Sequence, residues 1–120
     1  MRFMSIYKAR ESNQPPREEE FARMGALIEE MTKKGVLIAT GGCLPSALGA
    51  RVRSDNGKLS VTDGPFTETK ELIAGFAILE CASRDEAIEM AKRFLHVVGG
   101  DGESEVRQMA MGQEGQPCAR

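Results

Sequence analysis

Two stretches of the chain place apolar residues three and four positions apart, which is the spacing of a helix with one buried face. The first follows a proline pair at positions 15 and 16 and three glutamates, and it ends before Gly35. Acidic residues in the first turn and glycine after the last turn are typical helix ends, so we expect a helix to about Lys34. Its apolar positions are Phe21, Met24, Leu27, Ile28 and Met31.

The second helical stretch begins after Ser83, which forms a capping-box pattern with Glu86. Gly99 and Gly100 end it. Both helices are expected to cover an apolar layer with one face each. The apolar face of the second helix holds Ala87, Ile88, Met90, Ala91, Phe94 and Leu95.

Four other stretches have the pattern of strands. Two of them are continuous apolar runs, which is typical of strands buried on both faces, and these are Val36–Ala39 and Gly75–Leu79. The other two are Arg2–Lys8 at the start of the chain and the alternating run Glu103–Met109.

A β-hairpin is expected in the middle of the chain. Two alternating runs, Ala50–Ser54 and Lys58–Thr62, flank the turn sequence Asp-Asn-Gly at residues 55–57. The hairpin leads to a tight corner, Asp-Gly-Pro-Phe at residues 63–66, where glycine gives backbone freedom and proline fixes φ. The polar residues Thr67–Glu71 then predict a single helical turn.

The order of these elements predicts an α+β fold. Without the hairpin the order is βαββαβ, the ferredoxin-like pattern, in which an antiparallel sheet is covered by two helices on one face. We expect a single domain over residues 1–110, with the hairpin inserted, and a disordered tail over residues 111–120. Because two strands are apolar on both sides, the second face of the sheet also needs cover. A second copy of the chain is the expected cover, so we predict a homodimer.

Composition narrows the functional classes. The chain has 120 residues and a formal net charge of −2, so it lacks the basic field that nucleic acid requires. No apolar run approaches the roughly 20 residues of a membrane span, and the first residues have no signal-peptide pattern. We therefore expect a cytoplasmic protein that binds neither nucleic acid nor membrane.

Cysteine and histidine do not indicate a metal site. Cys43, Cys81 and Cys118 are odd in number and far apart, which favours plain thiols over disulfides or a Cys-x-x-Cys site. The one histidine, His96, ends the second helix, where it interacts favourably with the helix dipole. We expect no metal and no cofactor.

The corner carries a resemblance to a known family. The string Asp-Gly-Pro-Phe-Thr-Glu-Thr-Lys-Glu at residues 63–71, with residues 49–53, 75–76 and 105–107, resembles the DGPF-domain branch of the YCII-related proteins. The resemblance extends from Met1 to about Met109. It implies a dimeric α/β barrel of ferredoxin-like subunits. It also implies small bacterial proteins of poorly defined activity, some of them encoded beside extracytoplasmic-function sigma factors.

The resemblance also implies a site residue. In YCII-type relatives a histidine and an aspartate are proposed as a dyad in a pocket. The aspartate carries over to Asp63, whereas the histidine falls in the first helix, between Arg17 and Met24, where this chain has none. This departure argues against general acid–base catalysis.

Five residues are the candidates for a site. Asp63 is the candidate catalytic residue, because a carboxyl beside Phe66 would have a raised pKa and could act as acid or base. In the alternative interpretation, the Asp63 carboxylate accepts hydrogen bonds from backbone N–H groups in its own turn. Arg51 and Arg53 share one strand face, directed at an anionic ligand, a partner subunit or solvent. Cys43, in a Gly-Gly-Cys-Leu-Pro loop, is the best-placed reactive thiol.

Three functions remain open. The favoured one is a homodimeric binding module with a pocket near Asp63, Phe66 and the Gly41–Ser46 loop, which holds a small molecule or docks a regulatory partner. The second is an enzyme with Asp63 as acid or base on a small polar substrate. The third is a non-catalytic partner of sigma-factor-linked transcription regulation, which rests on the resemblance alone. The binding module is favoured because no second catalytic group accompanies Asp63.

Overall fold

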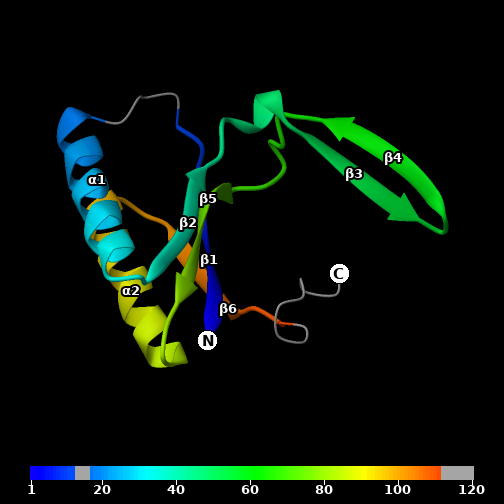
Figure 1. The fold of residues 1–120 in the computed structure, drawn as a ribbon. Helices are drawn as coiled ribbons and strands as arrows, with labels where there is room; N and C mark the ends of the chain where they lie inside the picture. Colours follow the sequence, from blue (N-terminus) through cyan, green and yellow to red (C-terminus); the bar gives the residue numbers. More distant parts are fainter. Residues whose placement is uncertain (13–16, 112–120) are drawn as a thin grey trace.

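The computed structural model describes residues 1–12 and 17–111 of the chain. Its main body is a four-stranded sheet in the order β2-β5-β1-β6, and both helices lie on one side of this sheet (Figure 1). All of its strand pairings are antiparallel, which confirms the predicted ferredoxin-like α+β fold. The strands are β1 (Arg2–Ala9), β2 (Leu37–Gly42), β5 (Leu72–Glu80) and β6 (Glu103–Gln108).

The two helices are α1 (Glu18–Lys33) and α2 (Arg84–Val98). The predicted cap of α2 is confirmed, because the Ser83 hydroxyl accepts a hydrogen bond from the Glu86 backbone N–H at 3.2 Å. An ion pair joins the helices: the Arg93 guanidinium donates to both carboxylate oxygens of Glu30, at 2.7 and 2.9 Å. This contact, with Lys34, lowers the pKa of the Glu30 carboxyl from 4.5 to about 2.

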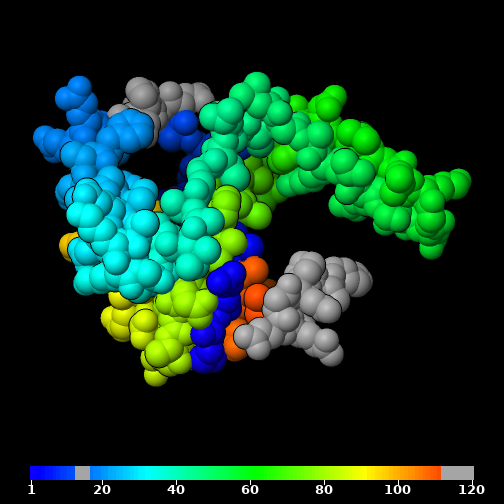
Figure 2. All heavy atoms as spheres, in the orientation of Figure 1, coloured from blue at the N-terminus to red at the C-terminus, as the bar shows by residue number. Residues whose placement is uncertain are grey.

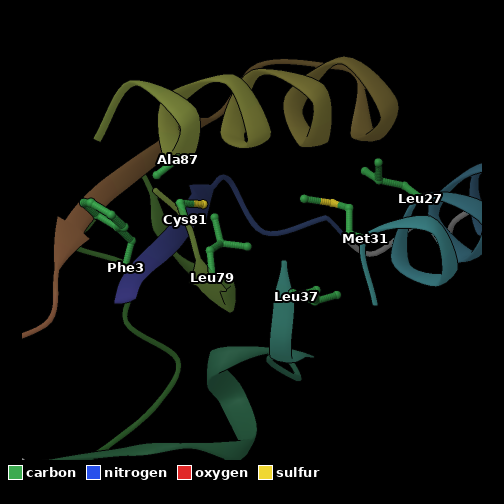
Figure 3. Close-up of a cluster of buried hydrophobic side chains, with 7 residues drawn as sticks. All are labelled: Phe3, Leu27, Met31, Leu37, Leu79, Cys81 and Ala87. Atoms are coloured by element: carbon green, nitrogen blue, oxygen red, sulfur yellow. The ribbon is translucent and has the colours of Figure 1, made fainter. Parts of the chain in front are cut away.

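The hydrophobic core lies between the helices and the sheet. Phe3 and Leu79 face each other across β1 and β5 and are each 2% exposed. Successive residues of a strand point to opposite faces, so Met4 and Ile6 lie on the other face of the sheet, which neither of the two described helices covers. The core cluster consists of Phe3, Leu27, Met31, Leu37, Leu79, Cys81 and Ala87 (Figure 3).

The predicted hairpin is present and forms a separate two-stranded sheet of β3 (Ala50–Asp55) and β4 (Lys58–Asp63). Asn56 and Gly57 in its turn have φ of 51° and 81°, as the tight turns of hairpins require. The hairpin extends away from the main body as an arm (Figures 1 and 2). Its apolar side chains are exposed: Val52 by 70%, Leu59 by 75% and Val61 by 66%.

Several details of the sequence prediction are wrong. Phe21 is 64% exposed, because helical spacing gives the face of a residue but not how far the opposing layer extends. The Val36–Ala39 run is not buried on both faces of the single chain: β2 is an edge strand, and Ile38 is 49% exposed. Residues 67–71 form a turn and bends instead of a helical turn, and β5 begins at Leu72, before the predicted start. A short 3₁₀ helix, η1 (Ser46–Leu48), was not predicted.

Some predictions concern parts of the chain outside the described residues. These are the helix start at Pro15 and Pro16, the tail beyond residue 111, and Cys118. Within residues 1–12 and 17–111, neither helix has the length and apolar character needed to cross a membrane.

Candidate functional site

A cleft of about 710 Å³ opens where the hairpin arm joins the main sheet. Its walls come from the ends of β1 and β2, from η1, and from the segment between β4 and β5. Polar and apolar groups share this lining, which includes Lys8, Cys43, Leu48, Arg51, Phe66 and Leu72.

The Asp-Gly-Pro-Phe corner docks on η1 and so closes one side of the cleft. The Gly64 backbone N–H donates to the Gly49 carbonyl at 2.9 Å, and the Phe66 backbone N–H donates to the Ser46 hydroxyl at 3.1 Å. The Ser46 backbone N–H in turn donates to a carboxylate oxygen of Glu11 at 3.0 Å. The Gly64–Pro65 peptide bond is cis. These bonds fix the ring of Phe66 at the wall of the cleft.

Gly64 is required at this corner because the two backbones approach very closely. A Cβ atom at position 64 would lie 1.7 Å from the carbonyl oxygen of Ser46 and 2.6 Å from its carbonyl carbon. Both are backbone atoms, so no side-chain rotation relieves the overlap. Only glycine allows this approach.

Arg51 on β3 is held by three residues of the segment that follows the corner. Its guanidinium carbon lies 3.9 Å from the centre of the Phe66 ring, a cation–π contact. One terminal nitrogen pairs with the Glu68 carboxylate, and the other donates to the Thr69 hydroxyl at 3.3 Å. A guanidinium has five N–H donors, so these contacts orient Arg51 and leave donors for another molecule.

The charges of the cleft are mixed. The hydrogen bond from Arg51 lowers the pKa of the Glu68 carboxyl, so this pair stays ionised at neutral pH. Lys8 donates to Glu105 at 2.8 Å, and this bond raises the pKa of the Lys8 ammonium. Two carboxylates, Glu11 and Glu71, also line the cleft. The arrangement suits a small molecule with polar groups at one end more than a bare anion.

The whole described body matches a family model. The model for the YCII-related domain covers residues 1–109. This chain belongs to the YCII-related family. An uncharacterized protein from Rhizobium meliloti (strain 1021) is 33% identical over 93 residues, which are 78% of this chain and 75% of that protein.

This YCII-related chain is also similar to solved structures. One of them is the 5-chloro-2-hydroxyhydroquinone dehydrochlorinase (TftG) from Burkholderia phenoliruptrix AC1100, in complex with 2,5-dihydroxybenzoquinone. The match has a TM-score of 0.48 and 19% sequence identity, and it covers 97% of this chain and 100% of that one. A likeness at this level carries no argument about the function of the present chain.

The structure separates the five candidate residues of this YCII-related protein into two groups. Arg51, Phe66 and Cys43 line the cleft, whereas Arg53 and Asp63 do not. Asp63 is exposed at the end of β4, and its carboxylate makes no hydrogen bond within the described part of the chain. The two roles that we considered for Asp63, as acid or base and as turn acceptor, stay predictions.

The remaining predicted positions lie away from the cleft. His96 is in the last turn of α2, as predicted, and its side chain is exposed. Among residues 1–12 and 17–111 there is no cluster of three or more His, Cys, Asp or Glu side chains that could hold a metal ion.

Sequence reasoning missed several residues of the cleft. Lys8, Glu11 and Leu48 were not predicted as site residues, because only tertiary structure brings them together. Glu68 and Thr69 could have been found, since both belong to the specific string at residues 63–71. Their contacts with Arg51 explain physically why these residue types occur in that string.

Proposed function

We propose that this chain is a homodimeric binding protein whose cleft holds a small molecule at Arg51. One observation carries the proposal. The guanidinium of Arg51 is oriented at the wall of the cleft by Phe66, Glu68 and Thr69. An oriented guanidinium group presents its N–H donors in a fixed geometry, which suits the recognition of carboxylate and carbonyl groups.

The other walls indicate the rest of the ligand. Leu44, Leu48 and Ile73 line the cleft and are exposed by 77%, 74% and 55%. Exposed large apolar residues gathered in one concave site are typical of ligand pockets. The ligand we propose therefore has an apolar body and one carboxylate or carbonyl group that accepts hydrogen bonds from Arg51.

The uncovered sheet face supports the dimer. Met4 pairs with Ile78 and Ile6 with Phe76 across β1 and β5, and all four side chains belong to this face. The exposed apolar residues of the arm add to it. An isolated two-stranded hairpin is marginally stable in water, which favours a second copy of the chain as the cover.

The dimer is tested by light scattering after size-exclusion chromatography. Ile6→Glu places a charge on the uncovered face and is expected to give a monomer. Phe21→Glu is the control, because Phe21 is an apolar residue that is exposed on α1, on the opposite side of the sheet from Ile6. A wild-type monomer, or equal masses for both variants, contradicts the proposed dimer.

Ligand binding is tested by a thermal-shift screen of small carboxylates, each paired with its neutral amide. Ligands that bind only the folded state raise the melting temperature. We expect carboxylates with an apolar body to stabilise the wild type and Arg53→Gln, but not Arg51→Gln. Arg53 is the matched control because it lies on the same face of the arm but outside the cleft. The proposal fails if no compound stabilises the wild type, or if both variants respond alike.

The catalytic alternative remains a prediction. Asp63→Asn is expected to retain ligand binding, because Asp63 lies outside the lining of the cleft. Loss of turnover of a bound compound in this variant, with binding retained, would instead favour an enzyme. The regulatory alternative has no structural observation in its favour.

A further inference from the structure

A second cavity lies inside the main body, between the helix layer and the sheet. It has a volume of about 400 Å³, and Figure 2 shows the molecule hollowed between α1 and the neighbouring strands. Small residues of the sheet, including Gly75 and Ala77 on β5, leave this space beneath Met24, Ile28 and Phe94 of the helices. The space is partly open to the surface, so a small molecule can enter it from outside.

Hydroxyl groups without partners line one side of the cavity. Ser5 on β1 is only 7% exposed and lines the cavity. Tyr7, two residues further, points to the same side of the sheet and also lines it. Neither hydroxyl makes a hydrogen bond within residues 1–12 and 17–111. Ser5 is buried and Tyr7 is half-buried, so both hydroxyls are available to hydrogen-bond a molecule that enters the cavity.

A third hydroxyl lies near this group. Ser104 on β6 lies opposite Tyr7 in the sheet register, which places both side chains on the helix-covered face. The Ser104 hydroxyl oxygen is buried and has no hydrogen-bond partner among the described residues. Ser104 is a neighbour of the cavity in the sheet but does not line it, so the hydroxyls without a partner in the lining are those of Ser5 and Tyr7.

The phenol of Tyr7 is held in place. Its ring packs edge-to-face against Phe94, with the ring centres 5.1 Å apart and an interplanar angle of 78°. A Cβ atom at Gly102 would lie 2.7 Å from Cε1 of the Tyr7 ring, so the backbone there confines the ring from a second side. Burial, with a smaller effect of Glu71, raises the pKa of the Tyr7 phenol, which therefore remains a neutral hydrogen-bond donor at physiological pH.

The lining defines the class of ligand. Among the described residues, no charged side chain lines this cavity. Its polar side chains are those of Ser5, Tyr7 and Thr40, and Thr40 already donates to the Phe76 carbonyl at 2.9 Å. A charged molecule would lose its hydration without an opposite charge to replace it. A cavity of roughly 150 Å³ holds benzene, so this one has room for one or two fused rings.

We propose that this cavity between the helices and the sheet is a second binding site, which takes a neutral molecule of one or two rings that hydrogen-bonds through a hydroxyl or carbonyl group to Tyr7 and Ser5. This site is distinct from the cleft at Arg51 and does not depend on the function proposed there. Water alone satisfies the hydroxyls but leaves the apolar remainder of the space empty, and that outcome is distinguished by the experiment.

The experiment uses 2-naphthol and naphthalene as probes, with methionine methyl groups labelled for NMR. Met24, Met31 and Met90 line the cavity, whereas Met109 and Met111 do not and act as internal controls. We expect 2-naphthol to shift the three cavity signals in a saturable way. No saturable shift, or equal shifts at all methionines, overturns the proposal and leaves water as the occupant.

Three variants locate the binding. Ala77→Leu fills the cavity and is expected to abolish binding, whereas Ala26→Leu, on the exposed side of α1, is expected to retain it. Tyr7→Phe keeps the ring but removes the hydroxyl, so the preference for 2-naphthol over naphthalene should fall about fivefold, as expected for one hydrogen bond. Arg51→Gln is expected to bind as the wild type does, which separates this site from the cleft.

Either of two results contradicts the site. One is unchanged binding in a folded Ala77→Leu variant. The other is an unchanged preference for 2-naphthol in Tyr7→Phe, which decides the matter even if Ala77→Leu does not fold.

Discussion

The substitution Gly64→Ala tests how the cleft is built. The added Cβ would lie 1.7 Å from the Ser46 carbonyl oxygen, far inside any allowed contact, and both partners are backbone. The corner must therefore move away from η1. This movement breaks the bonds from Gly64 N–H to Gly49 and from Phe66 N–H to Ser46. At roughly 1 kcal/mol for each hydrogen bond, the free energy of unfolding should fall by about 2 kcal/mol.

The location of the structural change in Gly64→Ala tests the account as well as the loss of stability does. The four-stranded sheet and both helices do not contact the corner through these bonds, so we expect their amide protection to persist. Amide exchange at positions 64 and 66 should instead become fast, and Arg51 should lose its fixed orientation because Phe66 moves. Urea unfolding and hydrogen exchange measure these two effects, at one protein concentration for all variants.

Gly49→Ala is the matched control. A Cβ atom at position 49 would lie 3.5 Å from the same Ser46 carbonyl oxygen, which is an ordinary contact. We expect this variant to unfold within about 0.5 kcal/mol of the wild type. If the two glycine variants unfold at the same urea concentration and both keep protection at positions 64 and 66, the described docking of the corner is wrong.

Three further predictions concern other parts of the fold. Gly25→Ala should raise the free energy of unfolding in urea by about 1 kcal/mol, because position 25 lies within α1 and no atom is near the new Cβ. Gly57→Ala should lower it by about 1 kcal/mol, because the φ of Gly57 is +81°. Equal effects of the two substitutions contradict this reasoning. The lowered pKa of the Glu30 carboxyl, about 2 against 4.5, means that its contact with Arg93 stabilises the fold above pH 4.5 and is lost as the pH falls toward 2. Between pH 4.5 and 2, the free energy of unfolding should therefore depend less on pH in Glu30→Gln than in Glu29→Gln, because the partner of Glu29, Lys33, lies within the same helix. Cys81 is buried, and burial raises the pKa of its thiol. Peptide mass spectrometry after maleimide treatment should therefore find the label on exposed Cys43 in the folded protein and on Cys81 only after unfolding. Equal labelling rates of the two thiols contradict the burial of Cys81.

The sequence was sufficient to predict the main architecture because the determining signals are local. Helical spacing predicted both helices, and the Asp-Asn-Gly turn predicted the arm, in which Asn56 and Gly57 adopt the positive φ that the turn demands. The order of elements then left the ferredoxin-like pattern as the simplest arrangement. Phe21 shows the limit of this reasoning: it has the spacing of the buried helix face, but the sheet does not extend far enough to cover its side chain, which is exposed.

The cleft was harder to predict because its contacts are long-range. Nothing near Ser46 in the sequence indicates that the backbone of residue 64 will lie against it. Arg51 and Arg53 look equivalent on an alternating strand, and only the position of Phe66 distinguishes them. Asp63 attracted attention through the family string, yet its neighbours in that string, Glu68 and Thr69, are the residues that hold Arg51.

The most direct test of the central claim is calorimetric titration with the tightest-binding carboxylate from the screen and with its neutral amide. If Arg51 receives the ligand, the wild type and Arg53→Gln prefer the carboxylate by about tenfold or more, as a charge-assisted hydrogen bond provides. In Arg51→Gln this preference should disappear. An unchanged preference in Arg51→Gln would contradict the account, because the ligand would then be recognised elsewhere.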